Sequence, residues 1–322
     1  MRPASRGSSI PTAKAASGRP SSPAPPTGAD PPAPSGPPCS SDGGHHQGGG
    51  FGDLRRQVSD LKKSNADLTR QGAAYQAQAG NANLLAQSYG AKIAANSLAK
   101  VPVVLLGAPG ATKSMKEATA AAIMAAGGSV ASRLQLTSDF ADPKRANDIR
   151  SLATAGSRPI GLQLPTTDDA GQLAGALLGY VLLGHGQGTD LAQVLTSFST
   201  LNMLKSESGN PAAGKALVLV TAGGLAKADP AGAMLLSFAD ELATIGGPTV
   251  IAGDQPSASQ NGLVGLARAD DTAKKALSTV DDATGPLGAL TVSLTVADAV
   301  AGRKGNYGVV AGADALMPGV SN

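Results

Sequence analysis

The chain has 322 residues, with 26 Lys and Arg against 23 Asp and Glu, so its formal net charge is only +3. Aromatic residues make up 2% of the sequence, and beyond residue 50 the basic residues alternate with acidic ones. This composition excludes the basic, aromatic-rich surface of nucleic-acid-binding proteins, so we expect no nucleic acid partner. No run of 18 apolar residues is present to form a transmembrane helix.

Residues 1–50 are built mainly from Pro, Gly, Ser and Ala, and half of all the prolines fall in the first forty positions. Such a segment lacks the apolar surface needed to offset chain entropy, which predicts a disordered leader without a signal peptide. The single cysteine, Cys39, excludes an intramolecular disulfide. Composition changes abruptly at Phe51, which motivates the hypothesis that this leader is a wrongly started translation of GC-rich DNA.

Residues 51–98 are predicted to form a coiled-coil helix. A 4-3 apolar repeat begins directly after the leader, with charged residues between its members. About three heptads is the lower limit for predicting a coiled coil, and a polar residue at an a position fixes register and strand number. The alternative is an amphipathic helix that packs on its own domain. The predicted seam of a homodimer consists of Leu54, Val58, Leu61, Asn65 and Leu68.

Residues 99–308 are predicted to form one α/β domain, followed by a flexible tail at 309–322. Short apolar runs alternate with longer helical patterns, which is typical of a mostly parallel sheet with helices on both faces. Strands are expected at residues 101–106, 129–136, 215–220, 249–252 and 262–267. Helices are expected at about residues 112–126, 143–155, 168–183, 189–204, 230–245 and 287–301.

The segment Gly107–Ser114 (GAPGATKS) follows a strand and opens a helix, as a phosphate-binding P-loop does. A P-loop requires glycine before the lysine so that backbone N–H groups can wrap the phosphates, and Thr112 stands there instead. We therefore favour a strand-to-helix turn in which Thr112 is the N-cap, with nucleotide binding as the weaker alternative.

No other pattern predicts a catalytic or cofactor site. His185 is the only histidine beyond the leader, and the methionines are scattered, so metal ligands stay unknown. His45–His46 and Cys39 can bind metal only adventitiously in a flexible leader. Three pairs of neighbouring aspartates point apart on regular structure and are interpreted as turn or cap residues, namely Asp168–Asp169, Asp270–Asp271 and Asp281–Asp282.

Three pieces near the C-terminus carry a resemblance to a known family. They are STVDD at Ser278–Asp282, LTVSLTVADAVAG at Leu290–Gly302, and GNYG at Gly305–Gly308. Together with the heptad segment RRQVSDLKKSNADL and the strand VPVVLLGAPGA before them, these pieces resemble the mycobacterial copper transport protein B (MctB) family. The resemblance covers roughly residues 51–315.

The resemblance implies an actinobacterial cell-envelope protein, associated with the outer membrane, that keeps intracellular copper low. Copper would be the transported ion rather than a cofactor, and no enzyme activity is implied. Family members typically begin with a transmembrane helix before the heptad segment, whereas residues 1–50 here are polar, so membrane association is expected without an anchor in this chain. The alternative is an envelope scaffold with no direct metal role.

Overall fold

The structure is a computed structural model, and it describes residues 49–319 except 156–157, 228 and 246. The predicted leader therefore lies almost wholly outside the described residues. The chain divides into two compact units, Met1–Lys63 and Ser64–Asn322. The first unit contributes the N-terminal part of helix α1 (Gly49–Ile93), and the second contains the rest of α1 and the sheet.

Within the described residues, seven strands form one sheet in the order β3-β2-β1-β4-β5-β6-β7. Only the edge strand β3 runs antiparallel, against β2, and every other neighbouring pair is parallel. The strands are β1 (Pro102–Gly107), β2 (Ser129–Leu136), β3 (Leu204–Ser206), β4 (Ala216–Val220), β5 (Thr249–Ala252), β6 (Ser278–Val280) and β7 (Asn306–Tyr307).

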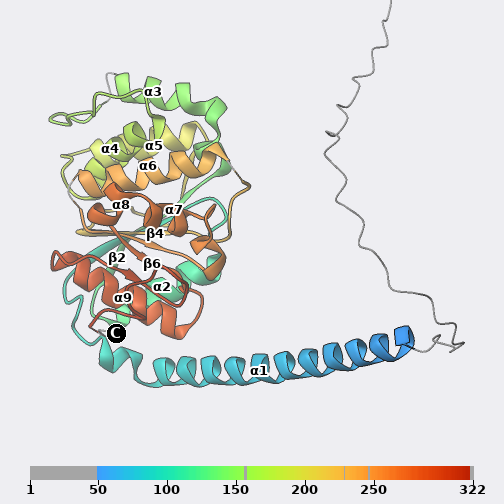
Figure 1. Cartoon of the computed structure of the whole chain (residues 1–322). Helices are drawn as coiled ribbons and strands as arrows, with labels where there is room; N and C mark the ends of the chain where they lie inside the picture. The colour runs from blue at the N-terminus through green and yellow to red at the C-terminus, as the bar shows by residue number, and fades with distance from the viewer. Residues whose placement is uncertain (1–48, 156–157, 228, 246, 320–322) are drawn as a thin grey trace, which may run out of the picture. The chain divides into compact units, whose positions relative to one another are not determined.

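Helices connect the strands and cover both faces of this sheet (Figure 1). Besides α1, they are α2 (Lys113–Ala125), α3 (Ala146–Thr154), α4 (Ala170–Leu182), α5 (Asp190–Thr200), α6 (Pro230–Thr244), α7 (Leu263–Ala269), α8 (Asp271–Ala276) and α9 (Pro286–Val300). The expectation of a mostly parallel sheet between two helical layers is confirmed.

Successive side chains of a central strand point to opposite faces of the sheet, and both faces are buried, which explains why these strands are continuously apolar. In β1, Val104 and Leu106 belong to the core beneath α3–α8, whereas Val103 and Leu105 belong to the core beneath α2, α9 and the end of α1. All four side chains are at most 1% exposed. A strand that is buried on both faces has no polar side, so a parallel sheet is recognisable from such runs.

The tightest helix pair on the first face is α4 with α6. Helix α4 presents Gly171, Gly175 and Gly179 to its neighbour at helical spacing. A Cβ at Gly175 would lie 2.8 Å from Phe238 O, so the two backbones approach closely only because these positions lack side chains. The helix expected at about residues 168–183 is thus present as α4, and most of its residues are buried.

One strand predicted from the sequence is wrong, and three strands of the structure were not predicted. Gly262–Ala267 (GLVGLA), predicted as the fifth strand, lies mostly in helix α7, because a short apolar run does not by itself distinguish a strand from a buried helix. The strand next to β5 is instead β6, which is buried but contains Ser278 and Thr279. The short strands β3 and β7 were not predicted either.

Within the second unit, the C-terminal end of α1 packs on the sheet's second helical layer. Ala86, Ala94 and the following Leu98 are buried there. Asn83 Oδ1 accepts a hydrogen bond of 3.1 Å from the Leu287 N–H, which supplies a cap that the first turn of α9 lacks from its own N-cap residue. The alternative interpretation of this helix, packing on its own domain, therefore holds for residues 83–98.

Candidate functional site

The segment Gly107–Ser114 joins β1 to α2, and the backbone N–H groups of Ala108 and Ala111 donate to carbonyls within the protein. The Ala108 N–H donates to a carbonyl of β4 at 2.7 Å, and the Met115 N–H donates to the Thr112 hydroxyl at 3.3 Å. The Lys113 side chain is 87% exposed and lies near a carboxylate one turn along the helix. These contacts support the turn with Thr112 as N-cap over a phosphate site.

A buried cation next to this turn is also used internally. Lys116 Nζ donates to Glu207 Oε1 at 2.5 Å and to Gln135 Oε1 at 2.7 Å. The Gln135 amide donates in turn to the carbonyls of Gly107 and Ala108. A Cβ at Gly107 would lie 2.3 Å from Gln135 Oε1, so any other residue there would displace the Gln135 amide from the strand end. This cluster fixes the turn and leaves no unpaired buried charge for a ligand.

Two of the three predicted aspartate pairs act as helix caps. Asp169 Oδ1 accepts from the Gln172 N–H at 2.9 Å at the start of α4. Asp270 Oδ1 accepts from the Thr272 and Ala273 N–H groups, both at 2.9 Å, at the start of α8. The cap interpretation is confirmed for these two residues, whose carboxylates satisfy otherwise free N–H groups.

The interpretation of Asp281–Asp282 as turn or cap residues is wrong for Asp281, because its side chain is fully buried. Its Oδ2 accepts from Arg268 Nη1 at 2.7 Å, and Arg268 is itself 8% exposed. Its Oδ1 accepts from the Val309 N–H at 2.7 Å, and Arg268 Nη2 donates to Tyr307 O. The ion pair thus joins α7, β6 and the segment after β7.

Two of the quoted C-terminal pieces, Ser278–Asp282 and Gly305–Gly308, meet at this buried ion pair. Ser278–Asp282 supplies β6 and Asp281, and Gly305–Gly308 supplies β7, which pairs with β6 in parallel. At Gly308 the backbone has φ 134°, and a Cβ there would lie 2.1 Å from Asp281 Oδ1. The two pieces of the signature therefore hold each other in place, which is a structural role and not a ligand set.

A further acidic pair, Asp240 and Glu241 on α6, consists of two carboxyls whose pKa values are raised. Burial raises the pKa of Asp240, with a smaller contribution from the charge of Asp270. Burial also raises the pKa of Glu241, with the charge of Asp240 second. Asp240 Oδ1 is buried without a hydrogen-bond partner among the described residues. Neighbours on a helix point apart, so this pair is not arranged for paired-carboxylate catalysis.

Residues 49–319, outside the gaps named above, contain no group of three or more His, Cys, Asp or Glu side chains that could hold a metal ion. His185 follows α4 and lies against Tyr180, with 5.8 Å between ring centroids. Of the methionines, Met115 lies in the core on one face of the sheet, and Met203 and Met234 lie in the core on the opposite face. The structure therefore assigns no metal ligand.

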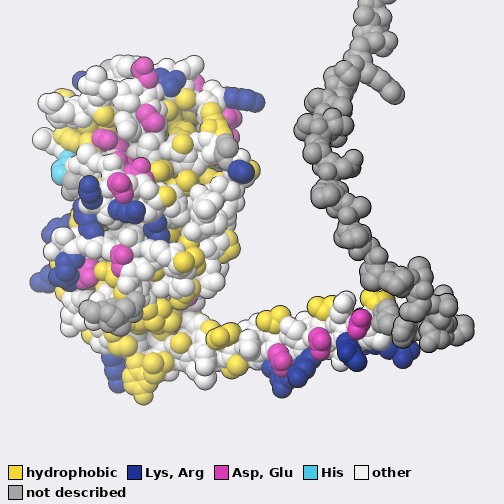
Figure 2. All heavy atoms as spheres, viewed as in Figure 1, with side chains coloured by type: hydrophobic (Ala, Val, Ile, Leu, Met, Phe, Trp, Pro, Cys, Tyr) yellow, Lys and Arg dark blue, Asp and Glu magenta, His cyan; other side chains and the backbone are white. Residues whose placement is uncertain are grey.

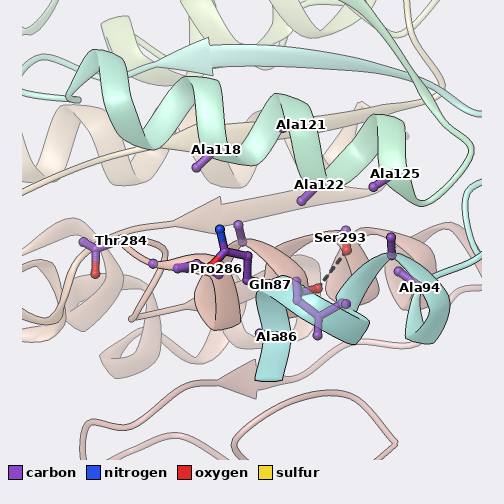
Figure 3. A pocket seen from close by; sticks show the side chains of 15 residues that line it. Ala86, Gln87, Ala94, Ala118, Ala121, Ala122, Ala125, Thr284, Pro286 and Ser293 are labelled. Carbon is purple, nitrogen blue, oxygen red and sulfur yellow. Dashed lines mark hydrogen bonds between the residues drawn. The ribbon is translucent and has the colours of Figure 1, made fainter. Parts of the chain in front are cut away.

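One hollow of the second unit is an apolar groove of about 340 Å³ between α1, α2 and α9. Helix α2 buries one side in the core and turns four alanines, at helical spacing, to the groove (Figure 3). Ala86, Gly90 and Ala94 come from α1, and Pro286 and Ala289 come from the first turn of α9. The alanines of α2 are Ala118, Ala121, Ala122 and Ala125.

Polar groups in this groove are few and uncharged. Gln87, Thr284 and Ser293 are the side chains with polar atoms among its lining residues. The Ser293 hydroxyl already donates to Leu290 O at 2.8 Å, as Figure 3 shows. With no lining group that titrates or ligates metal well, this groove offers shape and apolar surface rather than chemistry.

Helix α1 is the other distinctive surface, because its large apolar side chains are exposed. Leu54, Val58, Leu61 and Leu68 are each 49–69% exposed, and Tyr75 is 69% exposed. Apolar side chains follow one side of the helix and charged ones gather on the other (Figure 2). Isolated exposed leucines are ordinary, whereas a row of them at heptad spacing is the pattern from which the sequence predicts a coiled-coil seam.

Comparison with known proteins gives a family for this chain. The family model described as "Copper transport outer membrane protein, MctB" matches residues 44–318. The chain belongs to the MctB family. Relatives named copper transporter MctB from Mycobacterium tuberculosis and Mycobacterium bovis are each 31% identical over 271 residues, covering 81% of this chain and 86% of the relative. The Mycobacterium leprae relative of that name is 32% identical over 241 residues, covering 70% and 75%.

Family membership bears on location as well as on activity. The description of the MctB family points to an association with the cell envelope. Among the described residues, no helix combines the length and hydrophobicity that a membrane span requires. The seam of α1 remains a prediction, since a single chain does not show what covers it.

The sequence alone gave no sign of the apolar groove or of the Arg268–Asp281 pair. The alanines of α2 looked like generic helix formers, and their outward position follows only from how α1 and α9 pack. For this ion pair one signal was present, because Arg268 lies in an otherwise apolar stretch. An arginine within such a run indicates a buried partner, because an unpaired buried charge is too costly.

Proposed function

We propose that this chain takes part in copper transport at the bacterial cell envelope, where it limits intracellular copper without acting as an enzyme. The observation that carries this proposal is the match of the MctB family model to residues 44–318, together with relatives named copper transporter MctB over 81% of the chain. Copper is the cargo in this proposal and not a resident cofactor.

The non-enzymatic part of the proposal is supported by how the described charged residues are used. The buried cations Lys116 and Arg268 each pair with a carboxylate that holds secondary structure together. Where acidic side chains sit side by side, as Asp240 and Glu241 do, they are helix neighbours that point apart. Catalysis needs titratable groups that converge on one reacting atom, and this arrangement does not favour that.

Copper content of cells that lack the gene tests the proposal. Mass spectrometry of washed cells, after growth with added copper, should show more intracellular copper in the deletion strain than in the parent. The copper concentration that the strain tolerates should fall as well. Expression of the full chain should reverse both changes, and an empty vector is the control. Unchanged copper content and unchanged tolerance would contradict the proposal.

A second candidate is an envelope scaffold that touches no copper itself. The row of exposed apolar side chains on α1 favours it, because such a surface is suited to protein association. Titration of the purified full chain with Cu(I) and Cu(II) distinguishes the two candidates. Stoichiometric binding that a copper chelator reverses favours direct transport. No binding of either ion, with raised copper in the deletion strain, favours the scaffold.

A further inference from the structure

We propose that α1 joins two copies of this chain into a parallel, in-register, two-stranded coiled coil over residues 54–75. The partner is thus a second copy of the same chain, placed with its helix in the same direction. This proposal is independent of the copper function, and it follows from the exposed seam, from the polar residue within it and from the charges beside it.

The seam has the composition of a coiled coil, and its large apolar side chains are exposed in the single chain. Leu54, Leu61 and Leu68 occupy successive d positions, and Val58 occupies the a position between the first two. A β-branched residue at a with leucine at d favours two strands. Each of these side chains is about half exposed or more, whereas core leucines of the domain are nearly all buried. Pairing two seams would remove this apolar surface from water.

Asn65 selects the direction of the second helix. It takes the next a position after Val58. In a parallel pair an a residue meets the same residue of the other copy, so two Asn65 amides can hydrogen-bond to each other. In an antiparallel pair a faces d, and the amide would then meet an apolar side chain unless the register shifts. An unpaired amide in the seam costs free energy, which favours the parallel arrangement.

The flanking charges favour the same direction. The e positions hold Arg55 and Lys62, while the g positions hold Gln57 and Ser64. A parallel pair sets e against g of the other copy, so each basic side chain meets a neutral one. An antiparallel pair sets e against e, which brings basic side chains of the two copies together. Juxtaposed like charges disfavour that alternative.

The domain limits where the second helix can lie. Continued at the same spacing, the seam passes Gly72 and Tyr75 and reaches Ala86, which is only 6% exposed because the domain covers it. The stretch that remains free for pairing, from Leu54 to Tyr75, is about 33 Å long at 1.5 Å per residue. About three heptads make a weak coil, so association should depend on concentration in the micromolar range.

Light scattering on the full chain measures the strand number. The mass should rise towards twice 31.5 kDa between about 1 and about 100 µM protein. Leu61→Glu should raise the dissociation constant about 100-fold, because a charge replaces a buried leucine in both strands. Ala66→Glu, one turn along the same helix but outside the seam, should leave the constant within about threefold. A monomer at all concentrations, or a trimer or tetramer, overturns the proposal.

Cysteine pairs then test the direction, in a chain whose natural cysteine is removed by Cys39→Ser. Leu54→Cys and Leu68→Cys mark the two ends of the seam, and a disulfide requires Cα atoms within about 7 Å. In a parallel pair each variant should cross-link to itself under mild oxidation. Arg56→Cys and Arg70→Cys, on the opposite side of the helix, are the matched controls.

The pattern of cross-links decides between the arrangements. Self-cross-linking of both seam variants, without cross-linking of the controls, supports the parallel register. Cross-links that appear only when the Leu54→Cys and Leu68→Cys proteins are mixed show an antiparallel pair and overturn the proposal. Equal cross-linking of seam and control variants shows random collision, which also overturns it. Thermal unfolding of each variant confirms that the domain is intact.

Discussion

Removal of the Asp281 carboxylate should strongly destabilise the domain. Asp281 is 0% exposed and holds Arg268, which is 8% exposed, so Asp281→Ala leaves a charged guanidinium buried without its counter-ion. Breaking one side of a buried ion pair costs about 3–5 kcal/mol. The Val309 N–H also loses its acceptor, at about 1 kcal/mol. Since a domain has only about 5–15 kcal/mol of stability, this variant should unfold at much lower denaturant.

Urea unfolding followed by circular dichroism measures this cost. Asp282→Ala is the control, because Asp282 is next in the chain but only partly buried, and burial raises the pKa of its carboxyl. Its loss should change stability by less than about 1 kcal/mol. Arg268→Met, alone and combined with Asp281→Ala, completes a cycle whose coupling should exceed about 1 kcal/mol. Equal effects of the two aspartate variants, or additive effects in the cycle, would refute the reasoning.

Four further changes probe other parts of the molecule. Gly175→Ala should cost about 1–3 kcal/mol of stability in thermal unfolding, because its Cβ would lie 2.8 Å from Phe238 O. In Gly72→Ala the new Cβ meets nothing within 4 Å, so this variant should stabilise its helix by about 0.5–1 kcal/mol. Asp240→Asn should raise stability at about pH 7 but not at about pH 3. Burial raises the pKa of the Asp240 carboxyl, so the folded state loses stability as rising pH ionises this group. Urea titrations at both pH values check this prediction. Asn65→Leu should tighten association yet broaden the distribution of strand numbers, seen as higher masses in light scattering.

The strands that the sequence predicted share one property, namely that their own side chains carry the information. Val101–Leu106 and Ala216–Val220 are continuous apolar runs between helical patterns, and a strand buried on both faces requires such a run. The glycine-rich α4 was also recognisable as a buried helix. In each case a local pattern and the final packing agree, so tertiary contacts did not need to be known in advance.

The strands that the sequence missed depend on distant partners. The β6 residues Ser278 and Thr279 are polar, yet they are about 1% exposed. Their hydroxyls find partners far along the chain: the Gly305 N–H donates to Ser278 Oγ, and Arg268 Nε donates to Thr279 Oγ1. A polar strand of three residues has no apolar pattern that would identify it from the sequence. The earlier apolar run GLVGLA has a pattern typical of a strand but lies mostly in helix α7. Only the ladder with β5 and β7 makes β6 a strand.

The same limit applies to the functional surfaces, and it separates the two that matter here. The seam of α1 is visible in sequence because heptad spacing is a local property of one helix. The groove is not visible, because Ala118 and Ala122 become its wall only through the packing of α1 on α9. Surfaces made by a single element are therefore predictable, whereas surfaces made by three elements require coordinates.

A parallel seam also has a consequence that an antiparallel one lacks. Residues 83–98 attach α1 to the sheet at its C-terminal end, so two parallel helices bring both α/β domains to the same end of the coil. Each surface of the domain, the alanine-lined groove included, would then be present twice at that end of the coil. Two linked weak contacts bind more tightly than either one alone, by an amount set by their effective concentration. The alanine-lined groove would gain from such pairing, because apolar contacts of modest area are individually weak.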